Sequence, residues 1–468
     1  MSKFSFTFIG IFLLIISIFS FINIIYSNYF NHFLNLQSYF YSLVPSLILA
    51  FILLFTKKSN IKVTVYEKII VIIFGYFLLP LLISAPYYFS IYSIGFTNSY
   101  FEAISGFTST GFSIFENIKQ VDQSLILWRS SSQWIGGLYF LFSIILLIDI
   151  FDSNFKKTFT NFFIFSNSEI LKQLFKILLL YFSLTLLIFF LLKLSGFRYF
   201  DAVNLSFTII SSGGFLPTNS LDSILNNNFK EIILSTSMLL SFFSLFLIYN
   251  FIFVKEKKIN FYQEDIYLLL YLIVVTIFFT LFTNFNKNFT ELFLSITSSV
   301  SNIGISKNST NAYNSFLFLI LVIIGGSLFS SSSGLRFLKI YTLFKYSINE
   351  LISHVKPKEV NIIKLKFSNY LYDVNEINKI FITLILFVLS ILLLGSILTL
   401  TGIEFVYSLK VSILTLMNTT TSNIYGLGDF NFYDLSQITK YFLIFFMILG
   451  RIELLTLLIV LKKIFFKN

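Results

Sequence analysis

The stretch Asn98-Ser-Tyr-Phe-Glu-Ala-Ile-Ser-Gly-Phe-Thr-Ser-Thr-Gly111-Phe-Ser decides the fold of this chain. It is too short and too polar to cross a bilayer, yet it lies between two long apolar runs, residues 69–90 and 125–150. A polar segment at membrane depth is tolerated only where protein buries it or where it lines a water-filled path. We therefore expect this stretch to be a re-entrant pore loop.

The same unit occurs again further along the chain. A polar or acidic residue is followed 13 positions later by a glycine from 98 to 111, from 201 to 214 and from 291 to 304. Each interval opens with a stretch compatible with a short helix and closes in a tetrapeptide rich in Ser, Thr or Asn. A fourth loop opens at Glu404 and closes less clearly, before Gly426-Leu-Gly428. Such repetition sets the architecture, and here the unit is a span, a half-helix, a loop and a second span.

The composition is that of an all-α integral membrane protein. Of the 468 residues 56% are hydrophobic and only 12% are charged, and the mean hydropathy is +0.85. Apolar runs of about 20 residues indicate helices that cross a bilayer. The first run follows Lys3, but it is long for a signal peptide and has no small-residue cleavage site, so we expect a retained span. The expected spans, about ten of them, are residues 4–26, 36–56, 69–90, 125–150, 177–194, 231–254, 266–283, 316–343, 380–400 and 441–464.

The residue types exclude several classes of function. The chain has no cysteine, so it has no disulfide, thiolate metal site or cysteine nucleophile. Its two histidines, His32 and His354, lie in polar connectors and are expected to be solvated. A membrane enzyme would need a paired nucleophile and base or a metal cage, and these parts are missing. We therefore expect neither an enzyme nor a covalently bound cofactor, and the net charge of +11 follows membrane topology rather than nucleic-acid binding.

Basic residues fall in every second connector. If the N-terminus is cytoplasmic, connectors such as residues 57–68, 156–176, 255–258 and 336–379 lie inside, together with the basic C-terminal tail. Lys and Arg bias orients membrane proteins in this way. The prediction is a multi-pass protein of the cytoplasmic (inner) membrane with both termini cytoplasmic and with all four loops entering from outside.

Loops that enter from one side can meet on one axis and offer backbone carbonyls and hydroxyls to a dehydrated cation. The half-helices would point the partial negative charge of their C-terminal ends toward the same place. Glycine suits such a filter because it allows the alternating backbone conformations that bring carbonyls to one side. The pattern thus predicts a selectivity filter for a dehydrated cation.

The chain resembles the Trk/Ktr/HKT superfamily of potassium and sodium transporters, and its bacterial Trk/Ktr membrane subunits most closely. The resemblance rests on Ser105-Gly-Phe-Thr-Ser-Thr-Gly111, Leu127-Trp-Arg-Ser-Ser-Ser-Gln-Trp-Ile-Gly-Gly137, Phe200-Asp-Ala with Gly213-Gly-Phe215, and Leu449-Gly-Arg-Ile-Glu-Leu-Leu-Thr456. It implies two extra N-terminal helices (1–66) and four pseudo-symmetric repeats around one pore: 67–170, 171–262, 263–375 and 376–468. It also implies a homodimer in membrane lipid and a cytosolic nucleotide-binding regulatory subunit. The chain itself has no nucleotide fingerprint, so any nucleotide would be bound by that subunit.

The resemblance also implies which residues form the filter. The first three loops contribute Thr108, Ser109, Thr110, Gly111, Ser211, Ser212, Gly213, Gly214, Ser301, Asn302, Ile303 and Gly304, and the ion is expected at Thr110, Gly111, Ser212, Gly213, Asn302 and Ile303. In the fourth loop, counting back from Gly426 puts Ile424 at the glycine position, whereas a small insertion moves the filter to Asn418, Thr419, Thr420 and Thr421, followed by Ser422 and Asn423. Either way one glycine is missing, which makes sodium or mixed conduction more plausible.

The resemblance further implies an intramembrane gate below the filter, within residues 325–336. Its candidate residues are Gly325, Gly326, Ser330, Ser331, Ser332, Ser333 and Gly334. The alternative is an ordinary small-residue face for helix packing. Arg451 is expected beside the pore as an electrostatic barrier or latch, and the alternative is a salt bridge, for example with Glu453. Arg129 is expected at the external interface, where it would anchor Trp128 and Trp134.

The leading hypothesis is a channel-like monovalent cation transporter, potassium most plausibly, driven by the membrane potential and gated by a cytosolic partner. A sodium-selective or ion-coupled carrier of the same fold is the alternative. A non-conducting scaffold subunit and a membrane enzyme are more remote. The basic connector at residues 336–379 either docks a partner or only sets the topology, and positive-inside bias alone accounts for it.

Overall fold

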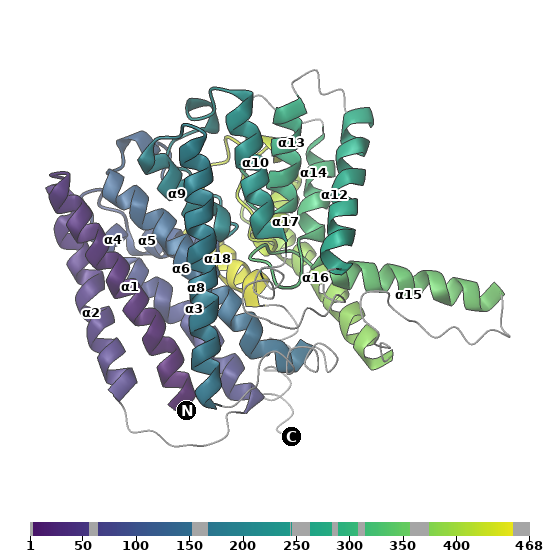
Figure 1. Cartoon of the computed structure of the whole chain (residues 1–468), viewed down its shortest axis with the longest axis horizontal. Helices are drawn as coiled ribbons and strands as arrows, with labels where there is room; N and C mark the ends of the chain where they lie inside the picture. The colour runs from purple at the N-terminus through teal and green to yellow at the C-terminus, as the bar shows by residue number, and fades with distance from the viewer. Residues whose placement is uncertain are drawn as a thin grey trace.

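The computed structural model describes residues 3–55, 64–151, 167–243, 245, 263–282, 289–307, 314–355 and 374–452. Over these residues the secondary structure consists of α-helices and short 3₁₀ turns, without strands, as the sequence predicts (Figure 1). Within them, seven helical segments are long and apolar enough to cross a membrane: Thr7–Tyr29, Phe33–Phe55, Val65–Tyr88, Gln123–Leu147, Leu174–Leu194, Glu264–Phe282 and Ile377–Leu400. The chain is therefore an all-α multi-pass membrane protein.

Two N-terminal helices form a hairpin at one edge of the molecule. They are α1 (Lys3–Tyr29) and α2 (Leu36–Phe55), drawn in purple in Figure 1. Small polar side chains allow them to pack closely, and the Ser20 hydroxyl donates to the Ser42 hydroxyl at 3.2 Å. Many large side chains on their other faces are exposed, such as Phe21 and Phe51, which suits a lipid-facing position.

After this hairpin, one order of elements occurs four times. A long helix comes first: α3 (Val65–Ile83), α8 (Asn167–Leu194), α12 (Gln263–Phe282) and α16 (Val374–Leu400). A 12-residue helix and a loop follow: α5 (Phe96–Phe107), α9 (Tyr199–Ile210), α13 (Phe289–Val300) and α17 (Phe405–Leu416). The unit ends in a further helix: α6 (Gln123–Phe151), α10 (Asn228–Phe242), α14 (Ser315–Ile324) and α18 (Gln437–Ile452).

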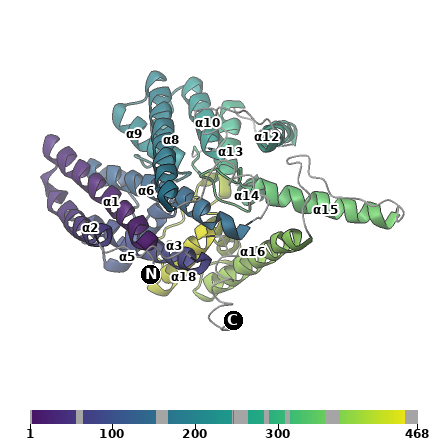
Figure 2. The ribbon, with the colours of Figure 1, turned by 60° about the horizontal axis from the view of Figure 1, so that its bottom comes forward.

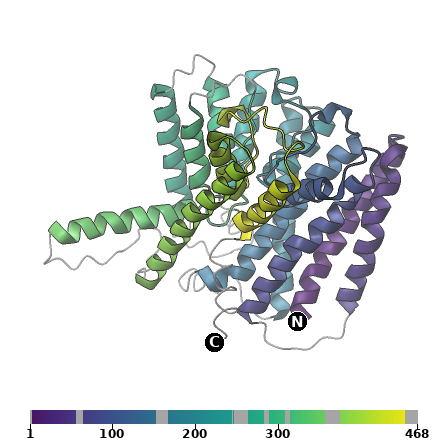
Figure 3. The same cartoon turned by 180° about the vertical axis from the view of Figure 1, so that it is seen from behind.

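The core of the molecule lies around α6 and the four short helices. The membrane-depth part of α6 is completely buried, whereas α12 and α16 keep most of their surface exposed. The views in Figures 2 and 3 show α15 (Phe337–Val355) leaving the helix bundle sideways beside α16. A short turn, α4 (Ala85–Tyr88), and 3₁₀ turns including η6 (Asn423–Tyr425) complete the connections.

Two of the expected spans are not continuous. The span expected at residues 316–343 leaves the helix at Gly325, whose φ is +66°, and becomes helical again in α15 at Phe337. The span expected at residues 231–254 is also interrupted, because Phe243 is extended with ψ 163°. Hydropathy reads both as single apolar runs, since it does not register backbone conformation. The first interruption lies in a Gly/Ser-rich sequence, and the second carries no such signal.

Candidate functional site

The four loops follow the same backbone path after their short helices. In each loop a non-glycine residue has a positive φ: Ser109 (57°), Ser212 (55°), Asn302 (59°) and Asn418 (47°). The next residue donates its N–H to a carbonyl five residues earlier, as in Thr110 to Ser105 (2.9 Å) and Thr419 to Leu414 (3.0 Å). The corresponding bonds in the second and third loops are Gly213 to Thr208 (2.8 Å) and Ile303 to Ser298 (3.0 Å).

This geometry gives the register of the fourth loop. The segment equivalent to residues 108–111 is residues 417–420, so Thr420 occupies the position of Gly111, Gly214 and Gly304. The structure contradicts the interpretation with Ile424 at the glycine position, because Ile424 is buried in η6. Thr421, Ser422 and Asn423 follow the loop rather than forming it. Glycine counting misses this register because no glycine marks it.

One brace present in three loops is absent from the fourth. Side-chain hydroxyls of the first three short helices donate to a carbonyl just beyond the loop: Ser105 to Phe112 (2.6 Å), Thr208 to Phe215 (3.0 Å) and Ser298 to Ile305 (2.7 Å). The equivalent residue in α17 is Leu414, which has no hydroxyl. The fourth loop is instead fixed through Asn418, which donates to Thr110 Oγ1 (3.0 Å) and to the Met447 carbonyl (2.9 Å).

The four loops meet at one place in the core. A Cβ built on Gly214 would lie 2.3 Å from Thr420 Cβ and 2.9 Å from the Ile303 carbonyl oxygen, and one built on Gly111 would lie 2.8 Å from Gly214 Cα. A Cβ on Gly304 would lie 2.7 Å from the Thr420 carbonyl oxygen. The Thr420 hydroxyl donates to the Gly111 carbonyl at 2.7 Å. The structure thus brings together the glycines that the sequence singled out.

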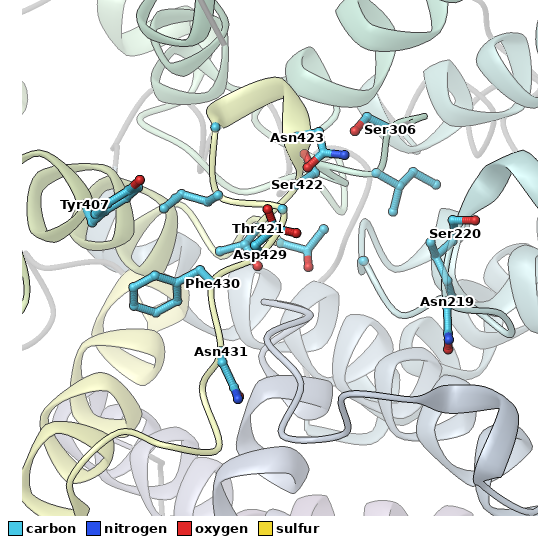
Figure 4. A pocket seen from close by; sticks show the side chains of 17 residues that line it. Asn219, Ser220, Ser306, Tyr407, Thr421, Ser422, Asn423, Asp429, Phe430 and Asn431 are labelled. Carbon is cyan, nitrogen blue, oxygen red and sulfur yellow. The ribbon is translucent and has the colours of Figure 1, made fainter. Parts of the chain in front are cut away.

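A polar vestibule opens on one side of this meeting point. Its volume is about 920 Å³, and Gly214 and Thr420 are among its lining residues. Figure 4 shows Thr421, Ser422 and Asn423 on one wall and Asn219 and Ser220 on another. The polar wall suits a hydrated ion on its way to the loops, and this face is the one expected to be external.

A glutamine that the sequence analysis did not single out supports the second loop. Gln133 of α6 is fully buried behind that loop. With its amide oriented to satisfy both ends, its oxygen accepts from the N–H groups of Gly214 (3.1 Å) and Phe215 (3.2 Å), and its nitrogen donates to Thr208 Oγ1 (3.3 Å). Gln133 belongs to the Trp-Arg…Gln-Trp-Ile-Gly-Gly motif, and this membership is the sequence feature that could have identified it as a functional residue.

The expectation for Arg129 is wrong. Its side chain is 1% exposed and pairs with the equally buried Glu102 of α5, with Nε 2.8 Å from Oε1. Glu102 also accepts from the Ile114 N–H (2.8 Å), and Arg129 donates to the Ser113 hydroxyl (2.8 Å). Hydropathy places Arg129 near a span end, but its partner on α5 is 27 positions away in sequence. The pair braces the chain leaving the first loop rather than anchoring an interface.

Residues 325–336, which we call the inner loop, lie on the other side of the meeting point. The Ser331 hydroxyl is 3.3 Å from that of Ser212. The Arg336 guanidinium donates to the carbonyls of Ser332 (2.6 Å) and Ser327 (3.1 Å) of the same loop. Because the inner loop is not helical, the alternative of a continuous helix-packing face is wrong. Glu264 of α12 adds an anchor by accepting from the Leu328 N–H at 3.0 Å.

Arg451 joins the inner loop to the first two pore loops. Its side chain is 2% exposed, and it donates to the Ser333 hydroxyl, the Ser109 hydroxyl (3.4 Å) and the Ser211 carbonyl (3.4 Å). Its guanidinium carbon lies 3.9 Å from the centre of the Phe140 ring. All these partners are neutral, and Glu453 lies outside the described residues. A fixed positive charge therefore stands directly beside the meeting point.

Close backbone contacts seat the last helix of two units against the short helices. A Cβ on Gly136 of α6 would lie 1.8 Å from the Phe107 carbonyl oxygen, and one on Gly450 of α18 would lie 2.2 Å from the Leu416 carbonyl oxygen. Phe107 and Leu416 are the last residues of α5 and α17. The two glycines are thus equivalent, and Arg451 takes the place that Gly137 has in the first unit.

The ligands offered at this site suit a bare monovalent cation. Its groups are carbonyls, hydroxyls and amides, the ligand types of cation filters. Within the part of the chain that the structure describes, no group of three His, Cys, Asp or Glu side chains could hold a tightly bound metal ion. The arrangement offers neutral oxygens as ligands to a cation.

Several known proteins are similar to this chain, although no family model matches the sequence. An uncharacterized cation transporter of Methanocaldococcus jannaschii is 25% identical over 97% of this chain and 94% of its own length. The Trk system potassium uptake proteins TrkH of Halomonas elongata and Escherichia coli are 21% and 22% identical, each over 80% of both chains. The crystal structure of the potassium transporter TrkH from Vibrio parahaemolyticus superposes with a TM-score of 0.85 over 98% of both chains, at 18% identity.

All four are named as transport proteins, in agreement with the expectation that this chain is not an enzyme. The sequence similarity extends over most of the chain, and the shared fold covers almost all of it. Over most of its length the chain is therefore similar in sequence to a cation transporter and to Trk system potassium uptake proteins, and it shares the fold of the potassium transporter TrkH.

Proposed function

We propose that this protein is a channel-like transporter that takes up monovalent cations, potassium foremost, across the cytoplasmic membrane. The observation that carries the proposal is the meeting of Gly111, Gly214, Gly304 and Thr420 from four equivalent loops. Carbonyls held at such a place replace the hydration shell of an ion. The names of the relatives, potassium uptake proteins and a cation transporter, support the same function.

In this proposal the ion passes from the vestibule to the four loops and then past the inner loop. The four short helices end at the loops, so the partial negative charge of their C-terminal ends attracts cations there. Arg451 opposes that attraction from the other side and makes prolonged occupancy unfavourable. The inner loop, bonded to Ser212 through Ser331 and to Arg451 through Ser333, closes the path below the loops.

The four repeats, at residues 67–170, 171–262, 263–375 and 376–468, belong to the same proposal. So do the homodimer, the cytosolic nucleotide-binding subunit and the cytoplasmic position of both termini. The support for a cytosolic partner is α15, which lies within the basic sequence 336–379 and projects from the helix bundle, where another protein can reach it. Any nucleotide would be bound by that partner.

Flux of purified protein in liposomes tests the proposal. We expect potassium and rubidium flux to exceed sodium flux, and we expect Arg451→Ala to change the flux while the fold is retained. Gly214→Ala should lose flux or ion preference, because its Cβ would meet Thr420 Cβ and the Ile303 carbonyl. A scaffold subunit would be unaffected by that change. Equal flux of the three ions would argue against a tuned filter.

A sodium-selective or mixed transporter is the second candidate, and Thr420 favours it. The first three loops have glycine at this position, whereas the fourth has a threonine. The hydroxyl of this threonine donates a hydrogen bond to the Gly111 carbonyl. A carbonyl that already accepts a hydrogen bond coordinates a cation less well. Competition between sodium and potassium for flux would distinguish the two candidates.

A further inference from the structure

The inner loop pairs with a second break in the membrane, the one in α10. Phe243 ends α10 in an extended conformation. In a continuous helix the Leu245 N–H would donate to the Ser241 carbonyl, four residues earlier. Here the Leu245 N–H donates to the Phe329 carbonyl of the inner loop at 3.0 Å. The helical hydrogen bond from the Leu245 N–H to the Ser241 carbonyl is therefore absent.

The inner loop also binds the acceptor of this missing hydrogen bond, the Ser241 carbonyl. The Ser241 carbonyl accepts from the Ser332 N–H at 3.4 Å and from the Ser331 hydroxyl at 3.4 Å. The next carbonyl of α10, that of Phe242, accepts from the Ser327 N–H at 3.1 Å. One missing helical bond in α10 is thus replaced by bonds to a segment 84 to 91 positions later in the sequence.

The contact is close enough to require a particular residue in the loop. A Cβ built on Gly326 would lie 2.6 Å from the Phe242 carbonyl oxygen and 2.9 Å from its ring. The inner loop therefore lies directly on the backbone of α10. At membrane depth, backbone groups left without a partner are strongly unfavourable, so this pairing cannot be lost without compensation.

We propose that α10 and the inner loop form an exchange switch. When the inner loop withdraws, α10 becomes continuous, because the Leu245 N–H then donates to the Ser241 carbonyl and both groups remain satisfied. The freed groups of the loop, among them the Phe329 carbonyl and the Ser332 N–H, turn to the water of the opened path. Opening is thus coupled to completion of a helix in the second repeat. This inference rests on the proposed function, because it describes how that pore opens.

Two substitutions at Phe243 test the switch, because they are expected to shift the equilibrium between the closed and open states in opposite directions. Alanine favours the helical conformation of residue 243 that the open state requires, and glycine disfavours it. Both remove the ring, so the loss of packing is common to the two variants. We expect the open probability of single channels in planar bilayers to be about fivefold higher for Phe243→Ala than for Phe243→Gly. A ratio near one, or below one, would overturn the switch.

Leu240 provides the matched control. It lies in the helical part of α10, so its conformation is the same in both states of the switch. Leu240→Ala and Leu240→Gly are therefore expected to have equal open probabilities, even if both are less stable. A difference as large as that at position 243 would mean that general helix stability, rather than the exchange, controls opening.

A cross-link gives a second measurement that does not depend on packing at residue 243. The chain has no cysteine, so a Ser241→Cys/Ser331→Cys variant carries only the two thiols of interest. A cleavable bifunctional methanethiosulfonate that links the two thiols should hold the inner loop on α10 and lower cation flux at least about tenfold. Reduction of the linker should free the inner loop and restore the flux. Full flux from linked protein would contradict the switch. Wild-type protein without flux would instead contradict the proposed function, which the same assay measures separately.

Discussion

At the scale of the residue, Thr420 is where this chain departs from its own repeat. The other three loops have glycine at this position, and the Thr420 hydroxyl donates to the Gly111 carbonyl. Thr420→Gly should release that carbonyl toward the ion. A hydrogen bond of this kind is worth about 1.4 kcal/mol, so the permeability ratio of potassium to sodium should rise about tenfold. Reversal potentials under bi-ionic conditions measure this ratio.

Thr421→Gly is the control for that change. Thr421 is adjacent in sequence, but it lines the vestibule instead of lying at the meeting point of the loops. Its removal is expected to leave the ratio unchanged, although chain flexibility rises equally in both variants. If both glycine variants shifted the ratio to the same extent, loop flexibility rather than the Gly111 carbonyl would set the ion preference.

At the scale of the element, the seating of α6 on α5 depends on Gly136. A methyl group there would lie 1.8 Å from the backbone oxygen of Phe107, and backbone cannot rotate away as a side chain can. Gly136→Ala should therefore lower stability by about 3 kcal/mol, at the upper end of the cost of overpacking. The midpoint of thermal unfolding in detergent, followed by circular dichroism, checks this expectation.

Gly395→Ala is the matched control for Gly136→Ala, because it replaces glycine with alanine in another long helix, α16. The nearest atom to its added methyl is Leu409 Cδ2 at 3.4 Å, an ordinary contact. Its unfolding midpoint should equal that of the wild type or exceed it, since alanine favours helix over glycine. Equal losses in both variants would show that helix flexibility, not the close approach of α6 to α5, is what the glycines provide.

The elements also show what a sequence can and cannot reveal. The helical fold and the first three loops follow from hydropathy and from the spacing of Gly111, Gly214 and Gly304. The register of the fourth loop does not, because it depends on hydrogen bonds of Asn418 to residues distant in sequence. The break at Phe243 gives no local signal either, since its freed groups are satisfied by the inner loop. Patterns record local preferences, and these features are fixed by distant partners.

At the scale of the whole molecule, the architecture makes an electrical prediction. In the proposed function, the four loops and the vestibule form an ion path lined by neutral oxygen ligands. A pore of this kind passes ions down their electrochemical gradient, one charge at a time. Its reversal potential should therefore shift by about 59 mV for each tenfold change in the potassium gradient.

A coupled carrier predicts something different in the same recording. If sodium or a proton moved with potassium in fixed ratio, the reversal potential would depend on both gradients, and its slope against potassium alone would fall well below that of a single charge. Varying sodium and pH at a constant potassium gradient separates the two cases. A reversal potential that follows pH, or that follows sodium with the fixed slope of a stoichiometric carrier, would contradict a simple pore. A pore that also admits sodium follows both gradients in proportion to the two permeabilities, and one that admits sodium poorly follows potassium alone.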